Sequence, residues 1–149
     1  MRDILNQIVS NKVLVASFLG WFIAQSLKTL VEFVKAGKVD FSRMIGSGGM
    51  PSSHSSLVTS MSTAIGLTEG FDSVIFALSF SIACIVMYDA SGVRLAVGKQ
   101  AKILNVMIED GKKHKFETER LKELIGHTPI QVYAGGILGI VIAFIYLKI

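Results

Sequence analysis

Charged residues are scarce in this sequence of 149 residues: Asp, Glu, Lys and Arg make up 17%, whereas hydrophobic residues make up 51%. Soluble globular domains usually carry about 25% charged residues, because polar surface keeps them in solution. The chain has one cysteine, Cys84, so an intramolecular disulfide is excluded. The composition therefore argues against a soluble domain and favours a membrane protein, and the length of residues 1–149 fits a single domain.

The apolar residues are concentrated in four blocks, which favours an all-α integral-membrane bundle of about four transmembrane helices. A helix that crosses the hydrocarbon needs about 20 apolar residues, with a lower limit of about 17. The second and third blocks are short by this measure, so a buried hairpin of a soluble protein is the alternative for them. The blocks are residues 13–34, 55–67, 73–87 and 130–147.

Basic residues lie mainly in the two connections that follow the first and third blocks. The positive-inside rule places such connections in the cytoplasm. With four spans, both termini would then face outward. We therefore expect a multi-pass protein of the inner or plasma membrane whose two long connections face the cytoplasm.

The longer connection, residues 88–127, contains an apolar pattern of its own. Its apolar residues recur at helical spacing, which predicts an amphipathic helix against the membrane surface or against the bundle. The residues of this pattern are Val93, Val97, Ala101, Leu104 and Ile108.

Residues 48–56, which read GGMPSSHSS, directly precede the second block. Glycines and small residues let backbone N–H groups turn toward an anion, and a helix N-terminus favours negative charge. The serines could instead be plain helix caps. His54 favours the first interpretation, because an imidazole beside an anion can protonate a leaving oxygen near neutral pH.

Two further clusters are expected at the same membrane face. The string YDASGVR carries Asp89 and Arg94, and the planar guanidinium of an arginine suits phosphate oxygens. Asp89 and Arg94 could also pair with each other. In GHTPIQVYAGGILG, His127 lies just before the fourth block. Gly135 and Gly139 have the small-xxx-small spacing that lets helices approach closely.

Two histidines at the mouths of two spans suggest phosphoryl transfer, in which histidine can form a covalent intermediate. A metal site is the alternative. Metal sites usually add carboxylates or cysteines, and the only nearby acid is Asp89. We therefore expect neither a metal nor another cofactor.

The strings GGMPSSHSS and GHTPIQVYAGGILG together resemble the type 2 phosphatidic acid phosphatase and vanadium haloperoxidase superfamily. The string IVMYDASGVRLAVGKQAKILN is similar to the pattern of its divergent bacterial branch, described as acid phosphatase/vanadium-dependent haloperoxidase-related. The resemblance covers most of the chain from residue 25 to residue 139. It implies a single membrane-embedded phosphatase-like domain.

The resemblance also implies roles for the loop residues. In the superfamily, a Pro-Ser-Gly-His loop supplies a hydroxyl, an amide and an acid histidine, and Pro51, Ser52, Ser53 and His54 occupy those places here. Ser53 keeps the backbone amide that glycine would supply. The implied phosphate ligands are Ser52, Ser53 and Gly49, with His54 as the proton donor.

A later His-x-Pro-x-Asp string of the superfamily supplies the nucleophile and the acid that orients it. His127 and Pro129 match this string, and Gln131 replaces the carboxylate. A glutamine carbonyl can accept the His127 N–H but does not stabilise the imidazolium. Loss of such a carboxylate costs about 10⁴ in rate in serine-protease triads. Asp89 could substitute for it in space.

The superfamily also uses an arginine ahead of the nucleophile and a lysine in its first motif, both on phosphate. Arg94 is the better match for the arginine and Arg120 the weaker one. The lysine has no clean match, and Lys28 is preferred because it lies at the end of a span. The candidates for it are Lys28, Lys35, Lys38 and Arg43.

These observations predict an integral-membrane phosphatase that hydrolyses a phosphomonoester or pyrophosphate of a lipid-like substrate through a phosphohistidine. The alternative is a non-catalytic protein that binds a phospholipid or polyprenyl-phosphate head group, and a transporter or channel subunit is a third hypothesis. The expected partners are the phosphorylated lipid or prenyl phosphate and the lipid bilayer, with no nucleic acid. A homodimer is compatible with the Gly- and Ser-rich faces.

Overall fold

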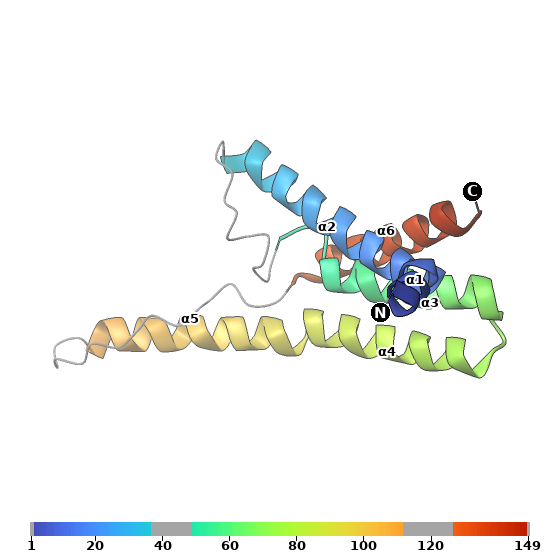
Figure 1. The fold of residues 1–149 in the computed structure, drawn as a ribbon. Coiled ribbons are helices and arrows are strands. Elements are labelled where there is room, and N and C mark those ends of the chain that lie inside the picture. The colour runs from blue at the N-terminus through green and yellow to red at the C-terminus, as the bar shows by residue number, and fades with distance from the viewer. Residues whose placement is uncertain (1, 37–48, 112–126, 149) are drawn as a thin grey trace.

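The computed structural model describes residues 2–36, 49–111 and 127–148, and these residues form helices without any strand (Figure 1). The all-α membrane bundle expected from the sequence is confirmed. Along the chain the helices are α1 (Arg2–Ser10), α2 (Lys12–Ala36), α3 (Ser53–Glu69), α4 (Val74–Ser91), α5 (Val93–Gly111) and α6 (Pro129–Lys148).

Three stretches of the described residues are long and apolar enough to cross a membrane: Lys12–Val34, Val74–Ile108 and Pro129–Lys148. They correspond to the first, third and fourth apolar blocks. The second block forms α3, whose 17 residues rise about 25 Å, less than the ~30 Å hydrocarbon core. The expected set of about four spans is therefore three long helices packed around a shorter one.

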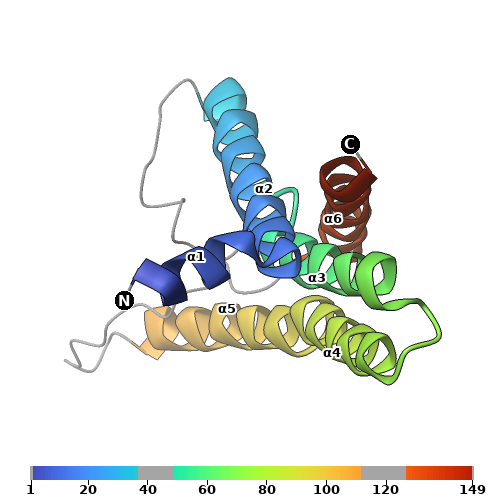
Figure 2. The ribbon, with the colours of Figure 1, turned by 45° about the vertical axis from the view of Figure 1, so that its right-hand side comes forward.

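The short helix α3 lies at the centre of the bundle, with α2 and α6 on one side and α4 on the other (Figures 1 and 2). Its hydroxyl groups donate to backbone carbonyls of neighbouring helices. Ser56 Oγ donates to the Gly20 carbonyl at 2.8 Å, and Ser60 Oγ donates to the Ala16 carbonyl at 2.8 Å. Such bonds between membrane helices stabilise their association by about 0.6 kcal/mol each on average.

Glycines of α6 let this helix approach α3 very closely. A Cβ atom on Gly139 would meet the Ser56 carbonyl oxygen and the Thr59 hydroxyl, so the two backbones are nearly in contact there. Thr59 Oγ1 also donates to the Gly136 carbonyl at 2.9 Å. The small-residue spacing noted in the sequence therefore serves helix packing.

Gly139→Ala should destabilise the protein strongly, because the added methyl group would press against backbone atoms that cannot move aside. Overpacking of this kind costs about 1–3 kcal/mol. Gly136→Ala is the matched control, because its Cβ would lie 3.2 Å from the flexible end of the Met87 side chain. Thermal unfolding in detergent should show a clearly lower midpoint for Gly139→Ala than for Gly136→Ala, and equal midpoints would contradict this account.

The helix α5 prolongs α4 instead of folding back on the bundle (Figure 1). Gly92 lies at the junction, and its N–H donates to the Tyr88 carbonyl at 2.8 Å, which keeps the chain helical. The helical spacing predicted for residues 93–108 is confirmed. Of the residues that the sequence placed on an apolar face, Val97 and Leu104 are exposed and Ala101 is buried, and the described helix that α5 contacts is α4.

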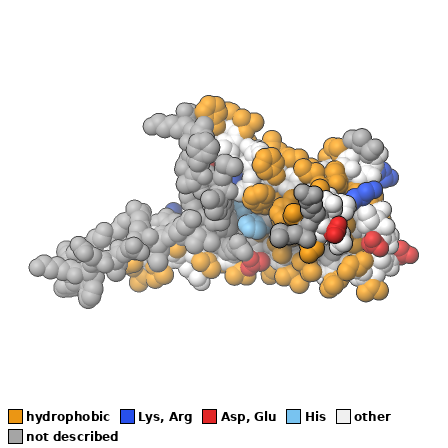
Figure 3. All heavy atoms as spheres, in the orientation of Figure 1, with side chains coloured by type: hydrophobic (Ala, Val, Ile, Leu, Met, Phe, Trp, Pro, Cys, Tyr) orange, Lys and Arg blue, Asp and Glu red, His pale blue; other side chains and the backbone are white. Residues whose placement is uncertain are grey.

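The outer surface of the bundle is apolar, as expected for contact with lipid. Figure 3 shows hydrophobic side chains over the flank of the helices, with acidic and basic side chains gathered where α3 and α6 end. At that end Val13 and Leu147 pack on a small core of Ala16, Ala64 and Ala143. The beginning of α2 and the end of α6 therefore lie at the same end of the bundle.

Candidate functional site

The candidate site begins in the loop that leads into α3. Gly49 has a φ of 89°, and the Met50–Pro51 peptide bond is cis. Ser52 caps α3, since its hydroxyl accepts from the Ser55 N–H at 3.4 Å and from the Ser55 hydroxyl at 3.0 Å. The capping role considered for the serines is therefore what Ser52 performs here.

The first turn of α6 is fastened to this loop by backbone contacts. The Ser52 N–H donates to the Gln131 carbonyl at 3.0 Å. A Cβ atom on Gly135 would collide with the Ser52 backbone, so a larger residue at position 135 would push α6 away. These contacts bring His127 and Gln131 beside the N-terminus of α3.

His127 is held from two sides and is 5% exposed. Its backbone N–H donates to the Ala90 carbonyl at the end of α4, at 3.0 Å. Its ring Nδ1 lies 3.3 Å from Gln131 Oε1. The buried imidazole is therefore fixed between the ends of α4 and α6.

The contacts of Gln131 determine which ring nitrogen of His127 carries the proton. The Thr128 backbone N–H, which can only donate, points to Gln131 Oε1 at 3.0 Å, so the oxygen of the amide must face this way. An amide oxygen can only accept, so His127 Nδ1 must be the donor. In the neutral ring, the lone pair is then on Nε2.

Burial lowers the pKa of His127 below its ordinary value of 6.5. The hydrogen bond to Gln131 raises it, the nearby His54 and Lys28 lower it by charge repulsion, and a backbone hydrogen bond at Gly49 raises it. The net effect is downward, so the ring is mostly neutral at pH 7. His127 thus combines a lone pair on Nε2 with the nearby side chains of His54 and Lys28.

The lowered pKa of His127 links its protonation to stability. The folded protein favours the neutral ring, so this stabilisation is present above pH 6.5 and is lost as the pH falls through the lowered pKa. We expect the thermal midpoint of the wild type to fall further than that of His127→Gln between about pH 7.5 and about pH 5. Parallel curves for the two proteins would contradict the lowered pKa.

Lys28 contributes a buried cation to this site. Its side chain is 3% exposed. A Cβ atom added to Gly49 would lie only 2.8 Å from the Cγ and Cδ atoms of Lys28. Any other residue at position 49 would displace the lysine and would also be strained at this positive φ. Four residues were candidates for the lysine of the first superfamily motif. Within the described residues, Lys28 is the candidate that lies beside the loop and near His127.

The other predicted residues are placed less completely. His54 lies on the first turn of α3 and is exposed, and Asp89 precedes Ala90 in the last turn of α4. Arg94 lies at the beginning of α5, and its side chain is outside the described residues. Predictions made for Lys38, Arg43 and Arg120 also fall outside the described residues, as does the side chain of Lys35.

The described residues contain no group of three or more His, Cys, Asp or Glu that could hold a metal ion. The polar groups of the candidate site are histidines, a lysine and amides. The expectation of a metal-free site remains a prediction.

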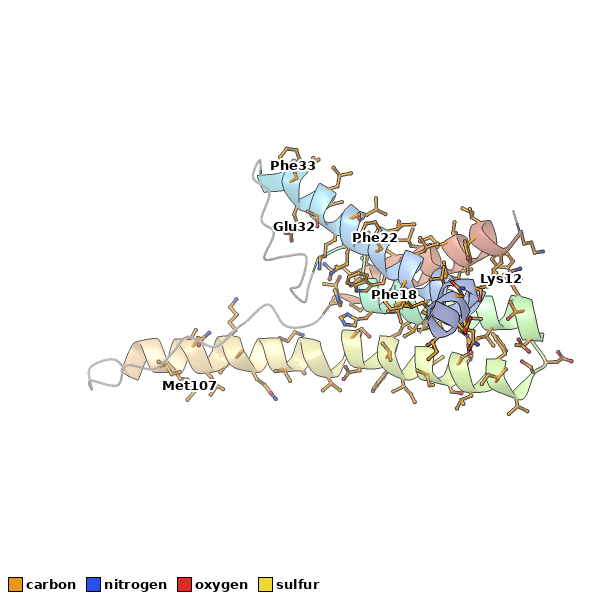
Figure 4. The ribbon with its side chains drawn as sticks, in the orientation of Figure 1. Lys12, Phe18, Phe22, Glu32, Phe33 and Met107 are labelled. Atoms are coloured by element: carbon orange, nitrogen blue, oxygen red, sulfur yellow. The ribbon has the colours of Figure 1, made fainter. Side chains whose placement is uncertain are left out.

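One feature of the site was missed in the sequence. The Glu32 carboxylate lies one turn after Lys28, with Oε1 3.6 Å from the place of a Cβ on Gly49. Figure 4 shows Glu32 on the side of α2 that faces away from Phe22 and Phe33. The signal was available, because Gln25, Lys28 and Glu32 recur at helical spacing within an apolar span.

The depth of the site follows from helix lengths. Lys28 lies 16 residues after Lys12 along α2, and Gln131 lies 17 residues before Lys148 along α6. At 1.5 Å per residue these separations are about 24 Å and about 26 Å. Since the hydrocarbon core is about 30 Å thick, the site lies about 4–6 Å from one boundary of the core when the Lys12 and Lys148 end reaches the other boundary.

Comparison with known proteins identifies the family of the chain. The chain is 37% identical over 151 residues to the "Uncharacterized membrane protein YuiD" of Bacillus subtilis (strain 168), a match that covers 93% of this chain and 96% of that protein. No solved structure gives a significant match. Residues 9–142 match the family model described as the divergent PAP2 family. The chain is therefore a membrane protein that belongs to the divergent PAP2 family.

Proposed function

We propose that this protein is a phosphatase that removes a phosphoryl group from a lipid-like phosphomonoester or pyrophosphate at the membrane surface. One observation carries the proposal: Gln131 Oε1 fixes the proton of His127 on Nδ1 and leaves the lone pair on Nε2. A neutral, oriented imidazole of this kind is a nucleophile for phosphorus. The membership of the divergent PAP2 family supports the same chemistry.

In the first step His127 Nε2 attacks phosphorus, and the bond from phosphorus to the leaving oxygen breaks. His54, whose exposed side chain is close enough to influence the charge of His127, donates a proton to that oxygen. The products of this step are the lipid alcohol, or the lipid monophosphate from a pyrophosphate, and a phosphohistidine. In the second step water attacks phosphorus, His54 accepts its proton, and phosphate leaves His127.

The charge of the transferring phosphoryl group needs donors around it. Lys28 is the buried cation beside His127. The Ser52 N–H is already bound to Gln131, so the amides of Ser53 and His54 in the first turn of α3 are the backbone donors that we assign to phosphate. Arg94 is the further cation that the family resemblance implies, and Arg43 is one of the alternatives to Lys28 for the first-motif cation.

The substrate follows from the depth of the site. A phosphate group at the boundary of the hydrocarbon core belongs to a lipid whose chains extend into the core. We infer that the site opens to the cytoplasm across an inner or plasma membrane, because the basic connections favour that side.

The proposal is tested with purified protein in detergent and chain-labelled and ³²P-labelled phosphatidic acid or prenyl pyrophosphate, without added metal. Phosphate release and a transient acid-labile, base-stable phosphoprotein are expected for the wild type. His114→Ala, which changes the third histidine of the chain, is the matched control and should retain turnover. Folded wild-type protein that binds these lipids without releasing phosphate would overturn the proposal.

A second candidate is a non-catalytic protein that binds a lipid phosphate head group. The observation in its favour is that Gln131, an uncharged residue, is the hydrogen-bond partner of His127 Nδ1. An amide orients the ring but does not stabilise its positive charge. Lipid binding without phosphoprotein formation in the assay above is the result that this candidate predicts.

A further inference from the structure

An apolar cavity of about 260 Å³ lies between α3, α4 and α6 and is open toward the outer surface of the bundle, where Phe80 and Phe144 are exposed. Most of its lining is aromatic or aliphatic, and four phenylalanines from the α3–α4 turn, α4 and α6 contribute to it. The buried Ala83 forms part of the wall on α4. The cavity is therefore separate from the polar site in chemistry, although the same three helices carry both.

The near end of the cavity lies one to two helical turns below the candidate site. Thr59 and Met87 line it there. Thr59 Oγ1 lies 2.8 Å from the Ser55 carbonyl oxygen, in the first turn of α3. Met87 lies one turn before Ala90, whose carbonyl accepts the His127 N–H. A molecule bound by its head group at the site would thus meet the opening of the cavity directly below.

The far end of the cavity is closed by Phe71. A Cβ atom on Gly66 would collide with the Phe71 ring, so that ring lies directly on α3. Phe76 and Met87 both line the cavity, and α4 rises about 17 Å between them. This length equals about half of the ~30 Å hydrocarbon core, which is the share of one leaflet.

The size of the cavity selects its occupant. A volume of about 260 Å³ exceeds the apolar cavity of about 150 Å³ that binds benzene in a well-studied soluble protein. A protein helix is about 10–12 Å in diameter with its side chains and would not fit. A flexible hydrocarbon chain is thinner than a helix, so it fits the volume and the length of the cavity.

We propose that this cavity holds one hydrocarbon chain of the lipid phosphate whose head group binds at the His127 site. The proposal rests on the proposed function for the position of the head group, and it deepens that function by specifying a chain-selective lipid substrate. Apolar contact along the chain would hold the phosphate in register with His127 Nε2.

Cys84 provides a direct reporter, because it lines the cavity and is the only cysteine of the chain. A small bimane fluorophore on Cys84 of the His127→Ala protein is reconstituted in vesicles with phosphatidic acid or phosphatidylcholine carrying brominated chains. Cys84 is itself exposed, so the matched control carries the fluorophore on Ile85→Cys in a Cys84→Ser background, at a neighbouring exposed position that lies outside the cavity lining.

Brominated phosphatidic acid should quench the fluorophore at Cys84 more strongly than brominated phosphatidylcholine at the same mole fraction. The fluorophore at position 85 should be quenched equally by both lipids. Unlabelled phosphatidic acid should reverse the selective quenching, whereas glycerol phosphate should not. Equal quenching of Cys84 by both lipids would overturn the proposal.

A cavity-filling variant gives an independent readout. Ala83→Leu fills space that the chain would occupy, whereas Ala77→Leu changes an exposed alanine outside the lining of the cavity. Ala83→Leu should raise the KM for a long-chain substrate about tenfold relative to that for a short-chain substrate. An unchanged KM ratio would contradict the proposal.

These experiments separate the chain site from the proposed function. Selective quenching without wild-type turnover would support the chain site and overturn the phosphatase. Turnover with equal quenching would support the phosphatase and overturn the chain site.

Discussion

His127→Ala is expected to lose phosphate release by at least about 10³-fold, because the variant has no nucleophile to form the covalent intermediate. The phosphoprotein should be absent at every time after mixing. The measurement is rapid-quench trapping of ³²P on the protein, with phosphate release followed in parallel. Normal turnover in His127→Ala would exclude the covalent route.

His54→Ala should give a different result, which makes the pair of variants informative. General-acid catalysis contributes about 10²–10⁴-fold, and its loss is felt most when the leaving group is poor. His54→Ala should therefore turn over lipid phosphates slowly but should form the phosphoprotein more readily from an aryl phosphate, whose leaving oxygen needs no proton. An equal loss with both leaving groups would exclude His54 as the proton donor.

Gln131→Leu is expected to reduce phosphate release by about 10²–10⁴-fold, although His127 itself is unchanged. Without Oε1, the Thr128 N–H and His127 Nδ1 both lose their acceptor, so neither the ring orientation nor the tautomer is fixed. The loss should fall on kcat rather than on KM, because Gln131 acts through His127. An equal effect on both constants would indicate a disturbed fold.

Gln131→Glu keeps the two acceptor contacts and adds a negative charge beside His127 Nδ1. The carboxylate stabilises the imidazolium, so it should raise the pKa of His127 and move the acid limb of the pH–rate profile upward. The wild-type limb should lie below pH 6.5, in keeping with the lowered pKa of this ring. A faster reaction in Gln131→Glu would show that the wild-type amide limits the rate, and an unmoved limb would contradict the assignment of His127.

Much of the fold could be predicted because apolar blocks of sufficient length identify membrane helices. The block around residues 55–67 was correctly located, but its role as a short central helix was not predicted. Hydropathy does not show that Ser56 and Ser60 would donate to carbonyls of α2. Likewise, the spacing of residues 93–108 predicted a helix but not its continuation from α4 through Gly92. Composition indicates which helices form and says less about how they pack.

The candidate site could be predicted only as far as side chains define it. The roles of His127 and Gln131 were implied by the resemblance to the superfamily's His-x-Pro-x-Asp string, and the structure places His127 Nδ1 3.3 Å from Gln131 Oε1. The backbone contributions could not be foreseen: the Ala90 carbonyl and the Thr128 N–H carry no sequence signal, yet they orient the imidazole. Glu32 was visible in the sequence and was not recognised as a neighbour of Gly49.

The hydroxyl groups of α3 have a consequence for how the protein is made. Because α3 is short and rich in serine, its own transfer into lipid is weakly driven, and its stable place depends on partners on either side. Ser56 and Ser60 can bond to α2 as soon as both helices exist, but the Thr59 bond to Gly136 joins residues 77 positions apart. The packing of α3 is therefore completed only after α6 has been synthesised, and a chain stopped before α6 would lack the Thr59 bond and the close contact of α3 with Gly139.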